Sequence, residues 1–175
     1  MVAIVYDAKD FWRLSKAFGR LPAEIKAIVT TRAMSRVASM GATRVVRRVA
    51  ERVDLPSGMV RERTRAYEGG GQAVISVRSN WIPLYKIGAR QTARGVSVKA
   101  RGSYAHAFIA GMRSGHAGVF LRAGKARLPI HELFGPNPAH DITNHPDVYQ
   151  LLIDDVAEAY VMPRMMHELS RVLPH

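Results

Sequence analysis

The sequence predicts an α+β fold, in which a small antiparallel sheet of about four strands packs with a long N-terminal helix and a C-terminal helix. Three observations predict it: apolar residues recur with a helical period over 23–53, alternate with polar residues over 72–122, and return to a helical period over 144–173. A chain of 175 residues that is 47% hydrophobic can bury one core. We therefore expect a single domain over 1–175, with a basic helical part (1–68), a basic sheet part with a corner loop (72–135) and an acidic helix (144–173).

Two helices are expected before residue 54. Asp7 or Asp10 can cap a short first helix that ends at Gly19. Its apolar residues are Phe11, Trp12, Leu14 and Phe18. Pro22 then begins the long helix, on which small and apolar residues form one narrow stripe. The stripe comprises Ile28, Thr31, Ala38, Ala42, Val45, Val49 and Val53.

Arginines cover the remainder of the long helix. The set comprises Arg32, Arg36, Arg44, Arg47 and Arg48, with Arg52 near the end. One interpretation is a solvated face whose long side chains cover neighbouring apolar surface. The other is a surface that contacts another subunit or faces DNA.

The middle of the chain is interpreted as strands. Leu55-Pro56 ends the long helix, and Ser57 can cap a shorter helix that runs to Tyr67. Beyond the Gly69-Gly70-Gly71 run, alternation predicts strands at 73–77, 96–100 and 104–112. β-Branched and aromatic residues between Gly118 and Gly124 predict another at 119–121, while 90–95 is expected to be an exposed loop. One face of this sheet is expected to carry Arg78, Lys99, Arg101 and Arg122. The apolar residues at 81–85 either pack under the sheet or contact a neighbouring subunit.

A constrained corner follows the last strand. Pro129, Gly135, Pro136 and Pro138 restrict the backbone on both sides of 130–134. The corner is interpreted either as a rigid contact loop presented to a neighbouring ring, or as a structural turn that buries its apolar residues. The contact-loop residues are Leu128, Pro129, Ile130, Phe134, Gly135 and Pro136; the buried turn would cover Leu128, Ile130, Leu133 and Phe134.

The last helix is expected to begin at Asn144-His145-Pro146-Asp147, where proline and an acid suit a helix start. Pro163 is expected to kink or interrupt it. An apolar face then continues to the C-terminus through Met162, Met165, Met166, Leu169, Val172 and Leu173. Such a face is typical of packing, although methionine also adapts to a partner's groove.

Charge divides the chain. The net charge of +12 is the balance of +7 over 1–70, +10 over 71–128 and −5 over 129–175, and the middle segment has no carboxylate at all. Such a segment has to meet solvent, nucleic acid or an acidic protein surface.

No catalytic constellation can be assembled, and we expect neither an enzyme nor a cofactor. The chain has no cysteine, its histidines lack metal-ligand spacing, and its glycines form no phosphate loop. No apolar run is long enough to span a membrane, so no membrane partner is expected.

Two runs carry a family resemblance. Gly118-Val-Phe-Leu-Arg and Arg127-Leu-Pro-Ile-His-Glu-Leu-Phe-Gly-Pro-Asn-Pro resemble the signature of the phage and prophage minor tail protein Z family. The resemblance is strongest over roughly residues 100–140. It implies a tail completion protein of long-tailed phages, a structural protein in the neck of the virion, assembled in the host cytoplasm. It also implies action beside a ring-shaped tail terminator or connector and next to the tail tube. We expect the chain itself to form a homo-oligomeric ring, with sixfold symmetry expected from the tail.

The charge division suggests how such a ring closes. We expect the basic sheet face of one subunit to meet the acidic helix of the next in a head-to-tail contact. The acidic set is Asp147, Asp154, Asp155 and Glu158. Packing of the same two surfaces within one chain is an equally physical explanation. The functional alternative is a protein that binds DNA or RNA without sequence preference through its basic surface; within a ring, that surface could also contact genomic DNA in the lumen.

Overall fold

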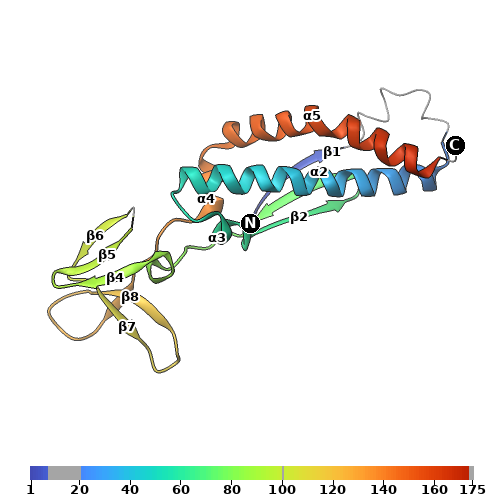
Figure 1. Cartoon of the computed structure of the whole chain (residues 1–175). Helices are drawn as coiled ribbons and strands as arrows, with labels where there is room; N and C mark the ends of the chain where they lie inside the picture. Colours follow the sequence, from blue (N-terminus) through green and yellow to red (C-terminus); the bar gives the residue numbers. More distant parts are fainter. Residues whose placement is uncertain (8–20, 100, 174–175) are drawn as a thin grey trace. The chain divides into compact units, whose positions relative to one another are not determined.

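The structure is a computed structural model that describes residues 1–7, 21–99 and 101–173. The chain forms two compact units. Unit 1 comprises Met1–Ser79 and Ala139–His175, and unit 2 comprises Asn80–Pro138. The predicted α+β class is confirmed: small antiparallel sheets occur with a long N-terminal helix and a C-terminal helix (Figure 1). The predicted short helix with Phe11, Trp12, Leu14 and Phe18 lies outside the described residues. Within the described ranges, no helix combines the length and apolar character needed to cross a membrane.

Unit 1 has one antiparallel sheet in the order β1-β3-β2. Its strands are β1 (Val2–Asp7), β2 (Thr64–Gly69) and β3 (Gln72–Val77). Gly70 and Gly71 both have positive φ, as the tight turn between β2 and β3 requires. The structure corrects one prediction here. The short helix α3 (Ser57–Arg61) stops before β2, because pairing with β3 outweighs local helical preference.

The long helix α2 (Ala23–Arg52) packs against α5 (Pro146–Val172) and the sheet. Buried residues on α2 come in adjacent pairs every four residues, from Val29 and Thr30 to Val49 and Ala50. Two adjacent rows of side chains on α2 are therefore buried, as expected for a helix that contacts both α5 and the sheet. At Gly41, an added Cβ would lie 2.8 Å from Ile75 of β3 and 3.5 Å from Ile153 of α5. The predicted stripe is correct at 38, 42, 45 and 49, but Ile28 and Thr31 are exposed.

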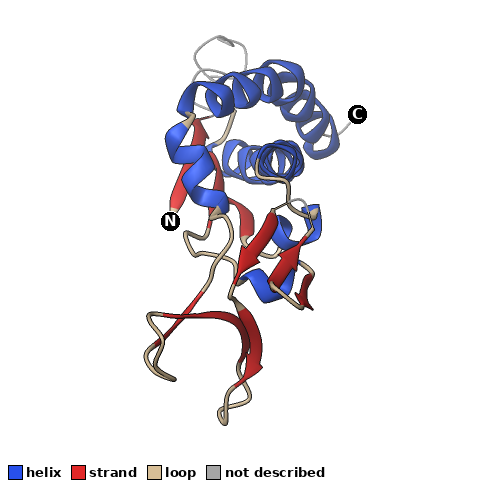
Figure 2. Cartoon of the chain, turned by 90° about the vertical axis from the view of Figure 1, so that its left-hand side faces the viewer, coloured by secondary structure: helices blue, strands red, loops and turns tan. Residues whose placement is uncertain are grey.

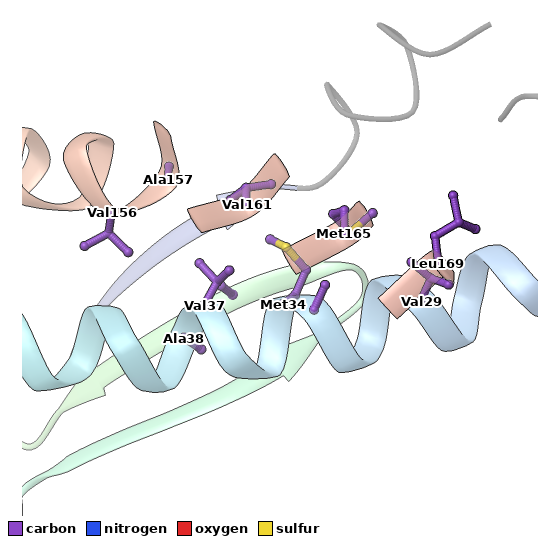
Figure 3. Packing of buried hydrophobic residues seen from close by; sticks show 11 residues of the cluster. Val29, Met34, Val37, Ala38, Val156, Ala157, Val161, Met165 and Leu169 are labelled. Carbon is purple, nitrogen blue, oxygen red and sulfur yellow. The ribbon is translucent and has the colours of Figure 1, made fainter. Parts of the chain in front are cut away.

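The core between the two helices is built from medium-sized apolar residues. Figure 3 shows Met34 and Val37 of α2 pointing toward Met165 and Val161 of α5. Pro146 stands in the first turn of α5, as predicted, but the helix runs uninterrupted through Pro163. Of the predicted apolar face, Met162, Met166 and Leu173 are exposed. The helix α4 (Pro138–Asn144) was not predicted.

Unit 2 contains two three-stranded antiparallel sheets and the 3-10 helix η2 (Leu84–Ile87) (Figure 2). The first sheet is β4 (Ala89–Thr92), β5 (Gly95–Val98) and β6 (Gly102–Ala105); the second is β7 (Phe108–Gly111), β8 (Ala117–Arg122) and β9 (Ile130–Glu132). The residues of its core are Leu84, Val96, Val98, Ala107 and Val119.

The strand predictions for unit 2 need three corrections. The strand predicted over 104–112 is two strands, because His106 has a positive φ of 62° between β6 and β7. The loop predicted over 90–95 contains β4 and the turn into β5. The single sheet of about four strands is replaced by three small sheets, one in unit 1 and two in unit 2.

Candidate assembly surfaces

The predicted acidic residues all lie on the solvent-exposed side of α5. Asp147, Asp154, Asp155 and Glu158 are all exposed, whereas Tyr149, Ile153, Val156 and Ala157 are buried. Asp147, Asp154 and Glu158 follow one another at spacings of seven and four residues, and Asp155 precedes Glu158 by three, so the four acids lie on one side of the helix. Leu151 and Met162 lie on the same side and are also exposed. We call these six residues the acidic face of α5.

The predicted basic residues do not share one sheet face. Arg78 follows β3 in unit 1, while Lys99, Arg101 and Arg122 belong to unit 2, around β5 and at the end of β8. That prediction is wrong because alternation fixes sides within a strand but not the sheet to which a strand belongs.

Arg122 has a local structural role. Its guanidinium lies 5.0 Å from the centroid of the Phe108 ring and donates to the Arg127 carbonyl at 2.6 Å. The side chain therefore holds the loop between β8 and β9 against β7. Lys99 is exposed and Arg101 is half-buried.

The predicted DNA-facing arginines of α2 are all exposed, yet three of them share a groove with acids. Arg44, Arg47 and Arg48 line a surface groove of about 590 Å³ between α2 and α5, together with Glu51 and Asp155. Arg32 and Arg36 are exposed elsewhere on α2. Acids within the chain thus offset part of the basic charge, which favours a solvated, internally balanced face.

Arg44 also makes a defined contact. Its guanidinium lies 5.3 Å from the centroid of the Tyr160 ring and donates to the tyrosine hydroxyl at 3.1 Å. The interaction joins α2 to α5 across the groove.

The corner loop divides into an outward part and a part built into the fold. Leu128 and Phe134 are exposed, so the interpretation as a turn that buries both is wrong. Ile130 pairs with Arg122, and Leu133 packs against the core of unit 2. Gly135 donates to the Ile82 carbonyl at 2.7 Å. Pro129 follows a cis peptide bond, and Pro136 accepts from the Ile82 backbone at 3.3 Å.

A polar cluster around Asp141 was missed by the sequence analysis. The Asp141 carboxylate accepts a hydrogen bond from Arg52 Nε of α2 at 3.1 Å, and one from the hydroxyl of Tyr149 on α5. His145 Nδ1 lies 3.3 Å from its Oδ1. The cluster ties α2, α4 and α5 together. Burial, followed by the hydrogen bond to Asp141, raises the pKa of Tyr149 well above its ordinary value near 10.

Replacing Tyr149 with phenylalanine should cost about 1–3 kcal/mol of stability at neutral pH, because the carboxylate loses a buried donor. Below pH 10 the Tyr149 hydroxyl is protonated in both the folded and the unfolded chain. Above pH 10 the unfolded chain loses this proton first, so the hydroxyl's contribution falls as pH rises toward the raised folded pKa. Urea unfolding at pH 8 and pH 11 should show the gap between wild type and variant narrowing, and a constant gap would contradict this assignment.

Among the described residues, no group of three or more His, Asp or Glu side chains is arranged to hold a metal ion. In unit 2, His116 and Glu132 lie within ion-pair distance, with the Nε2 and Oε2 atoms 2.9 Å apart. This pair connects the start of β8 to the end of β9.

The family model for prophage minor tail protein Z (GPZ) matches residues 17–174, a range that includes most of unit 1 and all of unit 2. No curated protein and no solved structure matches the chain.

Proposed function

The chain belongs to the prophage minor tail protein Z family and is a structural protein of the phage tail, and from this membership we propose that it acts as a tail completion protein. It sits in the neck, at the head-proximal end of the tail, and takes part in joining head to tail. It is assembled into the virion in the cytoplasm of the bacterial host. The observation that carries the proposal is the family match over residues 17–174.

We propose further that the protein acts as a ring of identical subunits, with sixfold symmetry expected from the tail. Its partners are the tail terminator, the connector and the tail tube. The acidic face of α5 on one subunit contacts the basic surface of unit 2 on the next. Residues 80–138 contain nine Lys/Arg and one Glu, so the two surfaces have opposite charge. Such a contact is heterologous, because it joins two different surfaces. It forms a closed ring when the repeated rotation from one subunit to the next returns to the first subunit.

Deleting the gene from the phage or prophage that carries it tests this function. Electron microscopy of the lysate should show filled heads and separate tails with few joined particles, and supplying the gene in trans should restore infectivity. Normal yields of joined, infectious particles from the deletion would contradict a role in tail completion.

The second candidate is nucleic-acid binding through unit 2, favoured by its excess of basic residues. A protein that contacts 6–10 phosphates loses roughly 10³–10⁵-fold in affinity between 50 and 200 mM salt. We expect the free chain to show no binding to labelled double-stranded DNA at 200 mM salt, because any contact with genomic DNA requires the assembled neck. Tight binding at low salt that falls with this slope would favour the second candidate.

A further inference from the structure

Unit 2 exposes aromatic side chains close to the ends of its sequence. Trp81 is 55% exposed and Phe134 is 48% exposed, and Tyr85 is exposed beside Lys86. Aromatic residues are enriched at protein interfaces, where tryptophan and tyrosine supply much of the binding energy. Clustered exposure of this kind marks an interaction site more often than scattered apolar residues do.

Backbone pairing places Trp81 and Phe134 on one surface. The Gly135 amide donates to the Ile82 carbonyl at 2.7 Å, and Pro83 lies opposite Phe134 in an antiparallel bridge. Ile82 is fully buried. Because side chains alternate along an extended chain, Trp81 and Pro83 point to the opposite side, together with Phe134. We call Trp81, Pro83 and Phe134 the aromatic patch.

The patch is held rigidly from behind. A Cβ added to Gly135 would lie 2.6 Å from Ile87 Cδ1, so the backbone packs directly on η2. The Leu84 amide donates to the Leu133 carbonyl at 3.2 Å, and Leu84 belongs to the core of unit 2. A preformed surface loses little conformational entropy when a partner docks.

The acidic face of α5 offers a matching surface. Leu151 is 67% exposed and Met162 is 45% exposed. They are separated by three helical turns, about 16 Å along the axis. The exposed acids Asp154, Asp155 and Glu158 lie between them on the same side of the helix. Leu151 also lines the groove that contains Arg44, Arg47 and Arg48. Unit 2, which carries the patch, has nine Lys/Arg and one Glu over residues 80–138, so its charge is opposite to that of these acids.

We propose that the aromatic patch of one copy docks between Leu151 and Met162 on α5 of the next copy. This inference rests on the ring assembly proposed above and names the apolar centre of its subunit contact. The aromatic side chains supply the affinity, and the surrounding charges set orientation and partner choice. Because the two surfaces differ, each subunit uses its patch toward one neighbour and its helix toward the other.

The test uses two single variants of the full chain, Trp81→Ala and Leu151→Ser, with Tyr67→Ala as the control. Tyr67 is an exposed aromatic residue on β2, outside the patch. Mass is measured by light scattering behind a sizing column over a concentration series. Each of the two variants should need at least about 30-fold more protein to assemble than wild type, while Tyr67→Ala assembles normally. Circular dichroism checks that the variants are folded, and Phe134→Ala replaces Trp81→Ala if that variant is not.

Mixing the two variants gives the sharper result. The Leu151→Ser chain has an intact patch, and the Trp81→Ala chain has an intact helix, so the mixture should form a dimer that neither variant forms alone. A wild-type chain that stays monomeric, a Trp81→Ala chain that assembles like wild type, or a mixture without dimers would each overturn the inference. Tail completion is judged separately: if either variant still restores infectivity to the deletion phage, the docking contact fails while the proposed function stands.

Discussion

Replacing Met165 with alanine is expected to lower the free energy of unfolding of unit 1 by about 2–5 kcal/mol. Met165 is fully buried between α5 and α2, where it packs in one cluster with Met34, Val161 and Leu169. Truncation removes apolar contacts and leaves a cavity that the close packing of two helices and a sheet can fill only in part. The helices α2, α3 and α5 belong to unit 1, so urea unfolding followed by circular dichroism at a helical wavelength reports on this unit.

The neighbouring residue provides a matched control. Met166 is 46% exposed on the same helix, so Met166→Ala should change stability by less than about 1 kcal/mol. Equal losses from the two substitutions would contradict the described packing of α5.

Reversing two charges on α5, as Asp154→Lys with Asp155→Lys, is expected to abolish assembly while the subunit stays folded. Both side chains are exposed, and the only hydrogen bond the structure gives to the carboxylate of Asp154, among the described residues, comes from Gln150 on the same helix. In the ring, the new lysines would face the basic surface of unit 2, and like charges across an interface cost several kcal/mol. Light scattering should find monomers at concentrations at which the wild type is oligomeric.

The same experiment separates the ring from packing within one chain. Asp155 shares its groove with Arg44, Arg47 and Arg48, so a contribution to the fold is a physical alternative. Loss of circular dichroism signal together with assembly would support that alternative. Glu24→Lys with Glu62→Lys changes the net charge by the same amount at exposed acids outside α5 and should leave assembly intact.

The helices were predicted where local chemistry determines them. Pro22 directly precedes α2, and Pro146 is the first residue of α5. Both helix starts were predicted correctly, because proline suits the first turn of a helix. The strand predicted at 73–77 from alternation lies within β3, and the strand predicted at 119–121 from its β-branched and aromatic residues lies within β8. By contrast, β1 forms because it pairs with β3, whose residues lie about seventy positions away in the sequence. The residues of β2 were predicted to be helical, and they form a strand because they also pair with β3.

Candidate surfaces were predictable only in part. The acidic residues of α5 share a face because helical spacing alone determines it. The basic residues are divided between two units because no local pattern shows which strands pair. The cluster of Arg52, Asp141 and Tyr149 joins residues 89 and 8 positions apart, and such separations have no motif. The aromatic patch depends on the pairing of 81–84 with 133–136, which the sequence does not reveal.

The position of the protein in the virion shows whether it acts where head and tail join. A short epitope tag on the chain, in a phage whose infectivity the tagged protein supports, can be located by gold-labelled antibody in electron micrographs of particles and of free tails. The account predicts gold at the head-proximal end of the tail, where head and tail join. Label at the distal tip, label along the tube, or particles that lack the chain altogether would contradict it.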